Sequence, residues 1–181
     1  MKHTSRIILY LSITILITNS CKKPLYKIGQ EYQGGIIFYI NSSDKHGLIA
    51  APVDQGDSID WGCQTLKIIG ADETKVGSGL QNTMDIVNGC ASPKIAARVC
   101  YDLVLNGYDD WYLPSKDELY IMYKNKNITG NFSNDIVAPY WSSSEYEDRA
   151  AWRQCFGESE KGEQTIYDKY NKYNVRAIRS F

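Results

Sequence analysis

The middle of the chain carries two strong helix signals, and the segments on either side have the composition of β-strands. The first helix is predicted to begin at Ser92, an N-cap residue that Pro93 follows in the first helical position. It is predicted to end at Asn106 and Gly107. Apolar residues recur at three- and four-residue spacing on one face of this helix: Ile95, Ala96, Val99, Cys100, Leu103 and Val104.

The second helix begins in a capping box, "SKDE". The Ser115 hydroxyl can accept a hydrogen bond from the backbone amide three residues later, and the Glu118 side chain can accept one from the Ser115 amide. Pro114 biases Leu113 away from helical geometry, so the residues before the helix are predicted to be extended. Trp111 and Leu113 are predicted to be core anchors. We therefore interpret these five residues as a structural corner.

Six segments are predicted to form strands, because each is short, largely apolar or β-branched and bounded by turn-like sequence: residues 34–40, 46–53, 140–144, 150–156, 163–168 and 173–181. Residues 56–79 are rich in glycine and are predicted to be a loop that Trp61 anchors to the core. A short helix is predicted over residues 80–89. Strands, then helices, then strands argue for an α+β fold with an antiparallel sheet.

The N-terminal segment has the layout of a secretory signal. Residues 1–6 begin it with positive charge, and an apolar run of about eleven residues follows, which is shorter than the roughly 20 residues that span a bilayer as a helix. Cys21 comes directly after small or polar residues, as in a bacterial lipobox. We predict a signal peptide over residues 1–20 and lipidation of Cys21; cleavage near Ser20 without a lipid is the alternative.

A lipid-anchored chain would place its folded part beyond a short tether. Residues 21–33 are predicted to be that tether, and residues 34–181 a single domain, because 181 residues suffice for one domain and are few for two. With 20 Lys and Arg against 21 Asp and Glu, the chain has no global positive field, and we predict that it does not bind nucleic acid.

Export also changes the interpretation of the cysteines. Without Cys21, four remain, and four cysteines in an oxidising compartment allow up to two disulfides with three connectivities. We favour a bond between Cys63 and Cys90, because both lie in loop-like sequence flanked by glycine. Cys100 falls on the apolar face of a predicted helix and is expected to be a buried free thiol, and Cys155 lies in a strand-like segment. The absence of a CxxC motif argues against a zinc site.

Several separated motifs in this order resemble the Lcl C-terminal domain family, which is named for a bacterial collagen-like adhesin and is common in bacterial lipoproteins: "WGC", "GSGLQNT", "CASPKIAARVC", "NGYDDWYLPSKDEL", "YWSSSEY" and "KYNVRAIRSF". The resemblance covers roughly residues 34–181. It implies a C-type-lectin-like fold, with two main helices packed on small antiparallel sheets and long loops. It also implies a relation to the fold of formylglycine-generating enzymes, and homotrimers as one assembly that family members can form.

The residues do not carry an enzyme activity over from that related fold. Formylglycine-generating enzymes use a pair of cysteines near the C-terminus, and here only Cys155 lies in that region. Asp109 and Asp110 are adjacent and would point in different directions in an extended turn. Asp117 and Glu118 lie in the first turn of a helix, where acidic residues are favoured. We predict no catalytic residues, no metal and no cofactor.

Asn106, Asp109 and Asp110 could supply oxygens to Ca²⁺ in a tight turn. Their spacing matches no named calcium loop, and the sequence lacks the Glu-Pro-Asn, Gln-Pro-Asp and Trp-Asn-Asp motifs of classical C-type lectins. An Asx-type turn is the preferred interpretation of these residues. The sequence leaves open whether this turn binds calcium.

The C-terminal part contains the best candidates for ligand binding. From residue 149 to residue 181, seven Lys and Arg oppose four Asp and Glu, and aromatic residues are interleaved with them. Aromatic faces can stack on sugar rings, and Arg and Lys can pair with sulfate or carboxylate groups. An ordinary solvated sheet face is the alternative. The predicted ligand-binding residues are Trp141, Tyr146, Arg149, Trp152, Arg153, Lys169, Lys172 and Arg176.

We therefore predict an exported, lipid-anchored binding or adhesion module of the bacterial cell envelope, either periplasmic or exposed at the surface. Its expected ligand is an anionic or other glycan of the envelope or the extracellular space. The alternative is a structural or protein-interaction module with an envelope protein as partner and no glycan ligand. Contact with the membrane is expected through the lipid anchor only.

Overall fold

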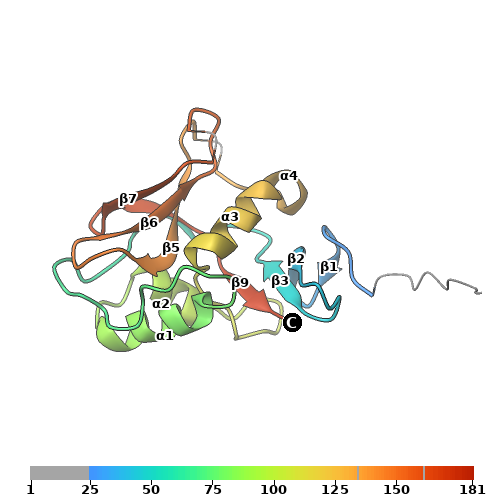
Figure 1. Ribbon diagram of the computed structural model, residues 1–181, viewed down its shortest axis with the longest axis horizontal. Helices are drawn as coiled ribbons and strands as arrows, with labels where there is room; N and C mark the ends of the chain where they lie inside the picture. Colours follow the sequence, from blue (N-terminus) through green and yellow to red (C-terminus); the bar gives the residue numbers. More distant parts are fainter. Residues whose placement is uncertain (1–24, 134, 161) are drawn as a thin grey trace, which may run out of the picture.

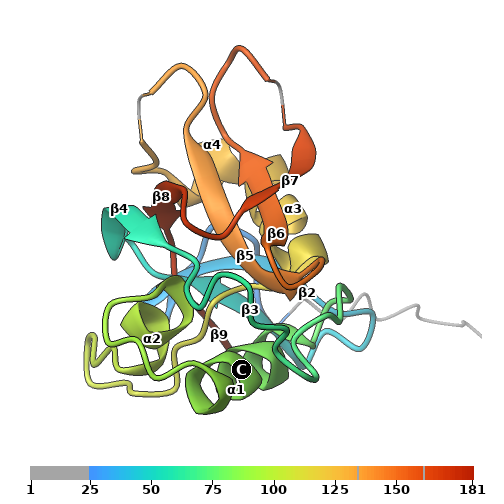
Figure 2. The ribbon, with the colours of Figure 1, turned by 90° about the vertical axis from the view of Figure 1, so that its left-hand side faces the viewer.

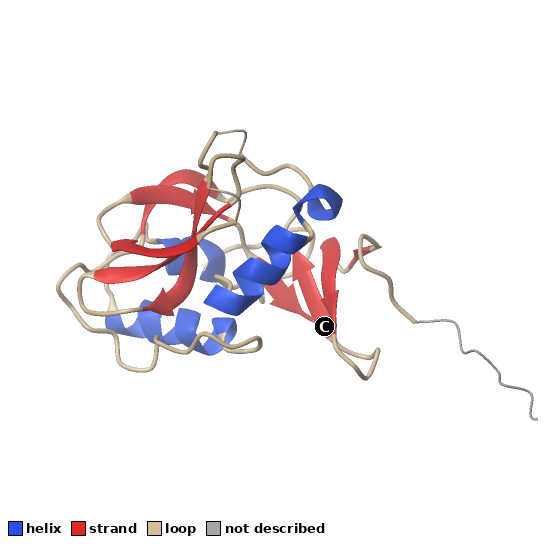
Figure 3. Cartoon of the chain, turned by 45° about the horizontal axis from the view of Figure 1, so that its top comes forward, coloured by secondary structure: helices blue, strands red, loops and turns tan. Residues whose placement is uncertain are grey.

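The computed structural model describes residues 25–133, 135–160 and 162–181. The predicted signal peptide and the predicted lipidation of Cys21 lie outside the described residues. Within these ranges no helix has the length and apolarity to cross a membrane. The described residues form two sheets and four helices. Figure 1 and Figure 3 show how these elements are arranged.

The first sheet is antiparallel, with the strand order β1-β2-β3-β9. Its strands come from both ends of the described chain: β1 (Glu31–Tyr32), β2 (Gly35–Ile40), β3 (Gly47–Ala50) and β9 (Ile178–Ser180). The predicted strands at residues 34–40 and 46–53 are therefore confirmed as a hairpin, since Ile36 pairs with Ala50 and Ile40 with Gly47.

The second sheet has the order β4-β8-β5-β6-β7. Its strands are β4 (Gly56–Asp60), β5 (Pro139–Glu145), β6 (Ala150–Cys155), β7 (Gln164–Asp168) and β8 (Lys172–Val175). Three pairs are antiparallel, and β5 and β8 run parallel at Tyr140 and Asn174, so the prediction of a wholly antiparallel sheet is wrong at this pair. The strand β4 also forms where a loop was predicted, because it pairs with β8 at the edge of the sheet.

The predicted strand over residues 173–181 is wrong in its middle. The chain leaves the second sheet after Val175 and enters the first at Ile178. At the crossing, the Arg176 side chain is buried, and the Ala177 backbone amide donates to the Gln55 side chain. These contacts hold the crossing segment between the two sheets.

Four helices surround the sheets: α1 (Gly79–Gly89), α2 (Ala96–Tyr101), α3 (Lys116–Lys124) and α4 (Lys126–Thr129). In Figure 2, α1 and α2 lie below β5 and β6. Helix α3 packs against β5 and β6 of one sheet and β2 of the other. The predicted arrangement of two main helices is too simple, although α1 and α3 are the two longest helices in the described ranges.

The predicted helix starting at Ser92 is wrong in its bounds. Its N-cap is Ile95, which is extended because it forms a parallel bridge with Asp60, so Ser92 and Pro93 precede the helix without capping it. The helix ends at Tyr101, and Val104 is 74% exposed. The turn predicted at Asn106 and Gly107 does exist, since both residues have positive φ and the backbone groups of Leu105 and Tyr108 bond to each other.

The capping box of the second predicted helix is confirmed. The Glu118 amide donates to Ser115 Oγ, and the Ser115 amide donates to Glu118 Oε2 at 2.8 Å. Glu118 is fully buried, and its Oε1 accepts a further bond from the Gly77 amide at 2.8 Å. Burial raises the pKa of Glu118, and the backbone amides oppose this effect. The Glu118 carboxylate therefore links the loop before α1, which contains Gly77, to the start of α3.

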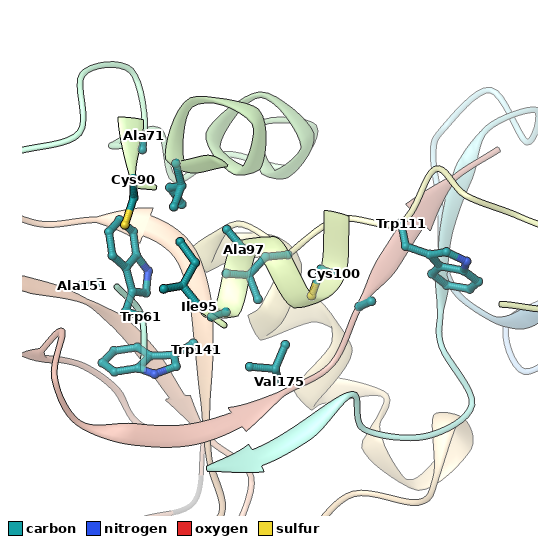
Figure 4. Close-up of a cluster of buried hydrophobic side chains, with 14 of the residues drawn as sticks. Trp61, Ala71, Cys90, Ile95, Ala97, Cys100, Trp111, Trp141, Ala151 and Val175 are labelled. Carbon is teal, nitrogen blue, oxygen red and sulfur yellow. The ribbon is translucent and has the colours of Figure 1, made fainter. Parts of the chain in front are cut away.

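The larger core cluster collects Trp61, Trp111 and Trp141, all of which are buried (Figure 4). The predicted core positions of Trp61, Trp111 and Leu113 are confirmed. A second cluster, which includes Phe38, Met122, Tyr140 and Phe156, fills the space between α3 and the two sheets.

The predicted disulfide between Cys63 and Cys90 is confirmed, and it joins the loop after β4 to the end of α1. Cys100 is a buried free thiol, as predicted, and burial raises its pKa far above the usual range.

The folded domain begins before residue 34. The ring of Tyr26 lies 4.8 Å from that of Phe181 and 5.1 Å from that of Tyr32, and β1 pairs with β2. The described part of the predicted tether is thus packed on the domain, because the Tyr26 ring contacts the rings of Tyr32 and Phe181.

Candidate functional site

The structure divides the eight predicted ligand-binding residues into two groups. Four of them are buried: Trp141, Arg153, Lys169 and Arg176. The prediction of a ligand-binding role is wrong for these four, because their side chains are enclosed by contacts within the domain. Arg149, Tyr146 and Lys172 are exposed, and Trp152 is half-buried.

Lys169 and Trp141 serve the core. The Lys169 ammonium contacts the Glu145 carboxylate, donates to the Leu66 carbonyl at 2.9 Å and lies over the Trp61 ring. Burial lowers the pKa of Lys169, and the bond to Glu145 opposes this effect. The indole Nε1 of Trp141 donates to the Ile59 carbonyl at 3.0 Å, which ties β5 to the edge strand β4.

Arg176 binds groups from two separate segments, residues 51–54 and residues 130–131. Its Nε donates to Asp54 Oδ1 at 2.6 Å, and its other nitrogens donate to the carbonyls of Ala51, Gly130 and Asn131. Burial raises the pKa of Asp54, while Arg176 lowers it. The guanidinium is therefore a structural connector with no donor directed to solvent.

Arg153 holds the loop after β6. Its guanidinium donates to Glu160 at 3.1 Å and to Thr165 at 3.1 Å, and it stacks 4.0 Å from the centre of the Tyr167 ring. The Cys155 thiol lies 2.6 Å from Glu160 Oε2, and burial raises its pKa to about 12. This thiol stays protonated at neutral pH and is a poor nucleophile.

Asp110, one of the three candidate calcium ligands, forms a bidentate ion pair with Arg179. Arg179 Nε donates to Asp110 Oδ1 at 2.6 Å, and Arg179 Nη2 donates to Asp110 Oδ2 at 2.7 Å. The bond from Arg179 lowers the pKa of Asp110. Asp109 is exposed, and Asn106 uses its amide nitrogen to bind the Gly34 carbonyl. Within the described ranges, no group of three or more His, Cys, Asp or Glu side chains is placed to hold a metal ion.

Two of the predicted residues, Tyr146 and Trp152, lie together on one surface. Tyr146, which follows β5 and is 51% exposed, meets Trp152 edge to face with ring centres 5.8 Å apart. The Lys116 ammonium lies 4.9 Å from the centre of the Trp152 ring. Ile166 of β7 is directly opposite Trp152 and is 39% exposed, so it extends the same face. We call Lys116, Tyr146, Trp152 and Ile166 the aromatic surface.

The aromatic surface has no strong charge of one sign. Lys116 is 3.5 Å from Asp117, and Arg149 follows Glu147 and Asp148 in the β5–β6 turn. Lys172, on β8, lies opposite Asp60 of β4. Because β5 separates β8 from β6 in the sheet, Lys172 does not join this surface. Sequence reasoning missed Lys116 and Ile166. The strand pattern around residue 166 could have placed Ile166 beside Trp152, whereas the position of Lys116 depends on how α3 packs.

The family model described as "Lcl C-terminal domain" matches residues 53–179. No protein with a curated description matches the chain. Among solved structures, the chain is similar to a fimbrial protein from Bacteroides ovatus ATCC 8483, with a TM-score of 0.51 and 15% sequence identity. The similarity covers 80% of this chain and 43% of that chain, so it concerns less than half of the fimbrial protein.

Proposed function

The chain belongs to the Lcl C-terminal domain family, and from this we propose that it is an adhesion module of the bacterial cell envelope or cell surface. The similarity in fold to a protein described as fimbrial supports this role. The disulfide between Cys63 and Cys90 supports an oxidising compartment. The signal-like N-terminus supports export, and lipidation at Cys21 would anchor the domain to a membrane.

The proposed ligand is a glycan, and the observation that carries this proposal is the pairing of Tyr146 and Trp152 on an exposed face. An exposed aromatic ring offers an apolar face on which a sugar ring can stack, and the Lys116 ammonium beside it can donate hydrogen bonds to hydroxyl groups. Tyr146 is the more exposed ring and is the proposed stacking platform. The edge-to-face contact with Trp152 holds the Tyr146 ring in its orientation.

The charges favour a neutral glycan over an anionic one. Four of the basic residues that suggested sulfate or carboxylate binding are buried and have acidic partners within the domain: Arg153 with Glu160, Lys169 with Glu145, Arg176 with Asp54 and Arg179 with Asp110. Since these charges are already neutralised, they add little attraction for an anionic chain. Binding is therefore expected to depend weakly on salt.

A glycan array tests this function. The purified protein is applied to neutral and sulfated glycans at two salt concentrations, with and without calcium. We expect binding to at least one neutral glycan, little change with salt or calcium, and a loss of about tenfold or more in affinity in Tyr146→Ala. Tyr101→Ala is the matched control, because Tyr101 is an exposed tyrosine on α2 outside the aromatic surface. Absence of binding to every glycan would reject the proposed ligand.

A protein partner is the second candidate, and the edge strand β7 favours it. This strand pairs only with β6, and it exposes Ile166 and Tyr167. An edge strand with apolar side chains can accept a strand from another chain. An envelope protein, or further copies of this chain in a homotrimer, could bind there. Crosslinking in intact cells through a photoreactive residue at position 167 would recover such a partner.

We further propose that the domain is not an enzyme and that it needs no cofactor, metal or nucleic acid. The protonated state of Cys155 and the internal pairing of the buried charges support this view. We also propose that the fold is C-type-lectin-like, which agrees with helices packed on small sheets and with long loops. An experimental structure superposed on known C-type lectins would test that assignment.

A further inference from the structure

A cavity of about 380 Å³ lies away from the aromatic surface, at the first sheet. Four segments line it: residues 31–36 from β1 to the start of β2, Pro52 after β3, the turn that carries Asn106, and the turn that carries Asn131. The side chains and backbone that form it come from Glu31, Tyr32, Gly34, Gly35, Ile36, Pro52, Asn106 and Asn131. Its volume is at the small end of the range for ligand pockets, which suits one small ring.

Two asparagines in this cavity are oriented in the same way. The Asn106 Nδ2 donates to the Gly34 carbonyl at 2.8 Å, and the Asn131 Nδ2 donates to the Pro52 carbonyl at 3.1 Å. Because each amide nitrogen is bound to a carbonyl, each amide oxygen remains as the acceptor for a ligand. Both residues have positive φ, which asparagine tolerates better than most residues.

Two buried arginines, Arg176 and Arg179, hold backbone beside the cavity in place. Arg176 donates to the Asn131 carbonyl, and the same guanidinium is bound to Asp54. On the other side, Arg179 donates to the Gln33 carbonyl next to Gly34, at 3.2 Å. Buried arginines therefore fix the backbone of Asn131 and the backbone beside Gly34, to whose carbonyl the Asn106 side chain is bound, so little order would be lost when a ligand binds.

The remaining groups define the chemistry of the ligand. Ile36 and Pro52 give the cavity an apolar wall, and Glu31, which is paired with Ile36 across β1 and β2, adds a carboxylate as a third acceptor. Three acceptors beside an apolar wall fit a molecule that carries several hydroxyl donors and has an apolar face. A sugar ring has both features, and an anion has neither the donors nor a favourable charge.

We propose that this cavity binds a neutral sugar residue, with its hydroxyls donating to Asn106, Asn131 and Glu31 and its apolar face against Ile36 and Pro52. The site is separate from the aromatic surface and does not require that surface to bind.

The test uses the purified protein and five probes: D-glucose, D-galactose, D-mannose, L-fucose and N-acetyl-D-glucosamine. Binding is measured by ligand-observed NMR and by titration of the ¹⁵N-labelled protein. We expect at least one sugar to bind and to shift the amide signals of Gly34 and Gly35. Asn131→Gly should weaken binding by about tenfold, because it removes one acceptor and keeps a residue that adopts positive φ.

Three variants complete the design. Asn171→Gly is the matched control, because Asn171 makes the same kind of bond, to the Asp168 carbonyl at 3.0 Å, outside the cavity. Glu31→Gln keeps an acceptor oxygen, so a neutral sugar should bind within about threefold of the original affinity. Tyr146→Ala should leave binding of these sugars to the cavity unchanged. The thermal unfolding midpoint of each variant shows that it is folded.

Several results would overturn the proposal. They are no binding of any of the five sugars, unchanged binding in a folded Asn131→Gly, and signal shifts confined to Tyr146 and Trp152. Binding of n-butylamine in place of every sugar, with loss in Glu31→Gln, would assign the cavity to a cation instead. A further result would separate the two proposals. If Tyr146→Ala lost glycan binding while Asn131→Gly kept it, the function proposed for the aromatic surface would stand and the cavity proposal would fail.

Discussion

Glu145 at the end of β5 and Lys169 after β7 form an ion pair in which both side chains are fully buried. The Glu145 carboxylate also accepts the Ile68 amide at 2.9 Å and contacts the Lys67 ammonium at 3.0 Å. One carboxylate thus connects the loop after Trp61 to the second sheet, and its loss would leave the Lys169 ammonium buried without its anion.

Glu145→Gln is expected to lower the free energy of unfolding by about 3–5 kcal/mol, as is usual when one partner of a buried pair is removed. Lys169→Met should cost less, because Lys67 still neutralises Glu145. Burial lowers the pKa of Lys169 in the folded protein, and the bond to Glu145 opposes this effect. In Glu145→Gln the opposing effect is lost, so folded Lys169 gives up its proton at a lower pH than in the original protein. The loss in free energy of unfolding caused by Glu145→Gln should therefore shrink as the pH rises. Urea denaturation at several pH values measures both effects.

A matched control for this ion pair is Glu158→Gln, which removes the exposed carboxylate that Lys126 contacts at 3.0 Å and leaves the bond from Lys126 to the Phe156 carbonyl in place. That change should cost no more than about 1 kcal/mol. Equal losses in Glu158→Gln and Glu145→Gln would show that the burial of the Glu145 pair has no special effect.

Asp110→Asn is expected to destabilise the protein at neutral pH and to have no effect in acid. The pKa of Asp110 is lowered in the folded state, mainly by the bond from Arg179, so the unfolded state takes up its proton first as the pH falls. The stabilisation is complete above the ordinary pKa of aspartate and is lost as the pH falls through the folded pKa. Because the Asp110 side chain is 53% exposed, the loss at pH 7 should be about 1 kcal/mol or less.

The measurement for Asp110 is urea denaturation of both proteins from pH 7 down to the lowest pH at which they fold. A deficit that grows in acid would contradict the assigned direction. Salt should reduce the deficit, since the carboxylate is partly in solvent.

Removal of the Cys63–Cys90 disulfide is expected to lower the free energy of unfolding by about 3–4 kcal/mol, because the bond closes a loop over a sequence separation of 27 residues. The double variant Cys63→Ser, Cys90→Ser would be compared with the original protein in urea, with and without reductant. Reductant should destabilise only the protein that has the bond. A similar response in both would place the stabilising disulfide elsewhere.

Ser115→Ala is expected to cost about 1–2 kcal/mol. It removes the acceptor for the Glu118 amide and the bond from Ser115 Oγ to the Lys75 carbonyl at 2.8 Å. Ser43→Ala is the control, because Ser43 lies in an exposed turn and bonds only locally, to Asn41. Its effect should stay within about 0.5 kcal/mol. Thermal unfolding of the three proteins under the same conditions gives the comparison.

Features with local causes could be predicted from the sequence. The capping box at Ser115 and Glu118 spans four residues, so both partners are visible in one motif. The β2–β3 hairpin follows from two neighbouring apolar runs around a turn. The α+β class followed from the order of such segments.

Features with distant causes could not be predicted in this way. Arg176 is buried because Asp54, 122 residues earlier, reaches it, and no pattern near Arg176 indicates that partner. Lys169 and Glu145 are similarly separated by two strands and two turns. A Lys or Arg beside aromatic residues therefore has the same sequence pattern whether it meets solvent or a buried carboxylate. Tyr146 and Trp152, the two predicted ligand-binding residues that lie together on the aromatic surface, are on one hairpin.

The contact between Tyr26 and Phe181 brings the beginning and the end of the folded domain side by side. Their rings are 4.8 Å apart, so a short linker could join the two positions in a circular permutant. In Figure 1 the β5–β6 hairpin lies at the left, and β1 and the C-terminus lie at the right. A tag or a solid support attached after Phe181 would therefore leave the hairpin with Tyr146 accessible, whereas the cavity beside Tyr32 would lie close to the attachment.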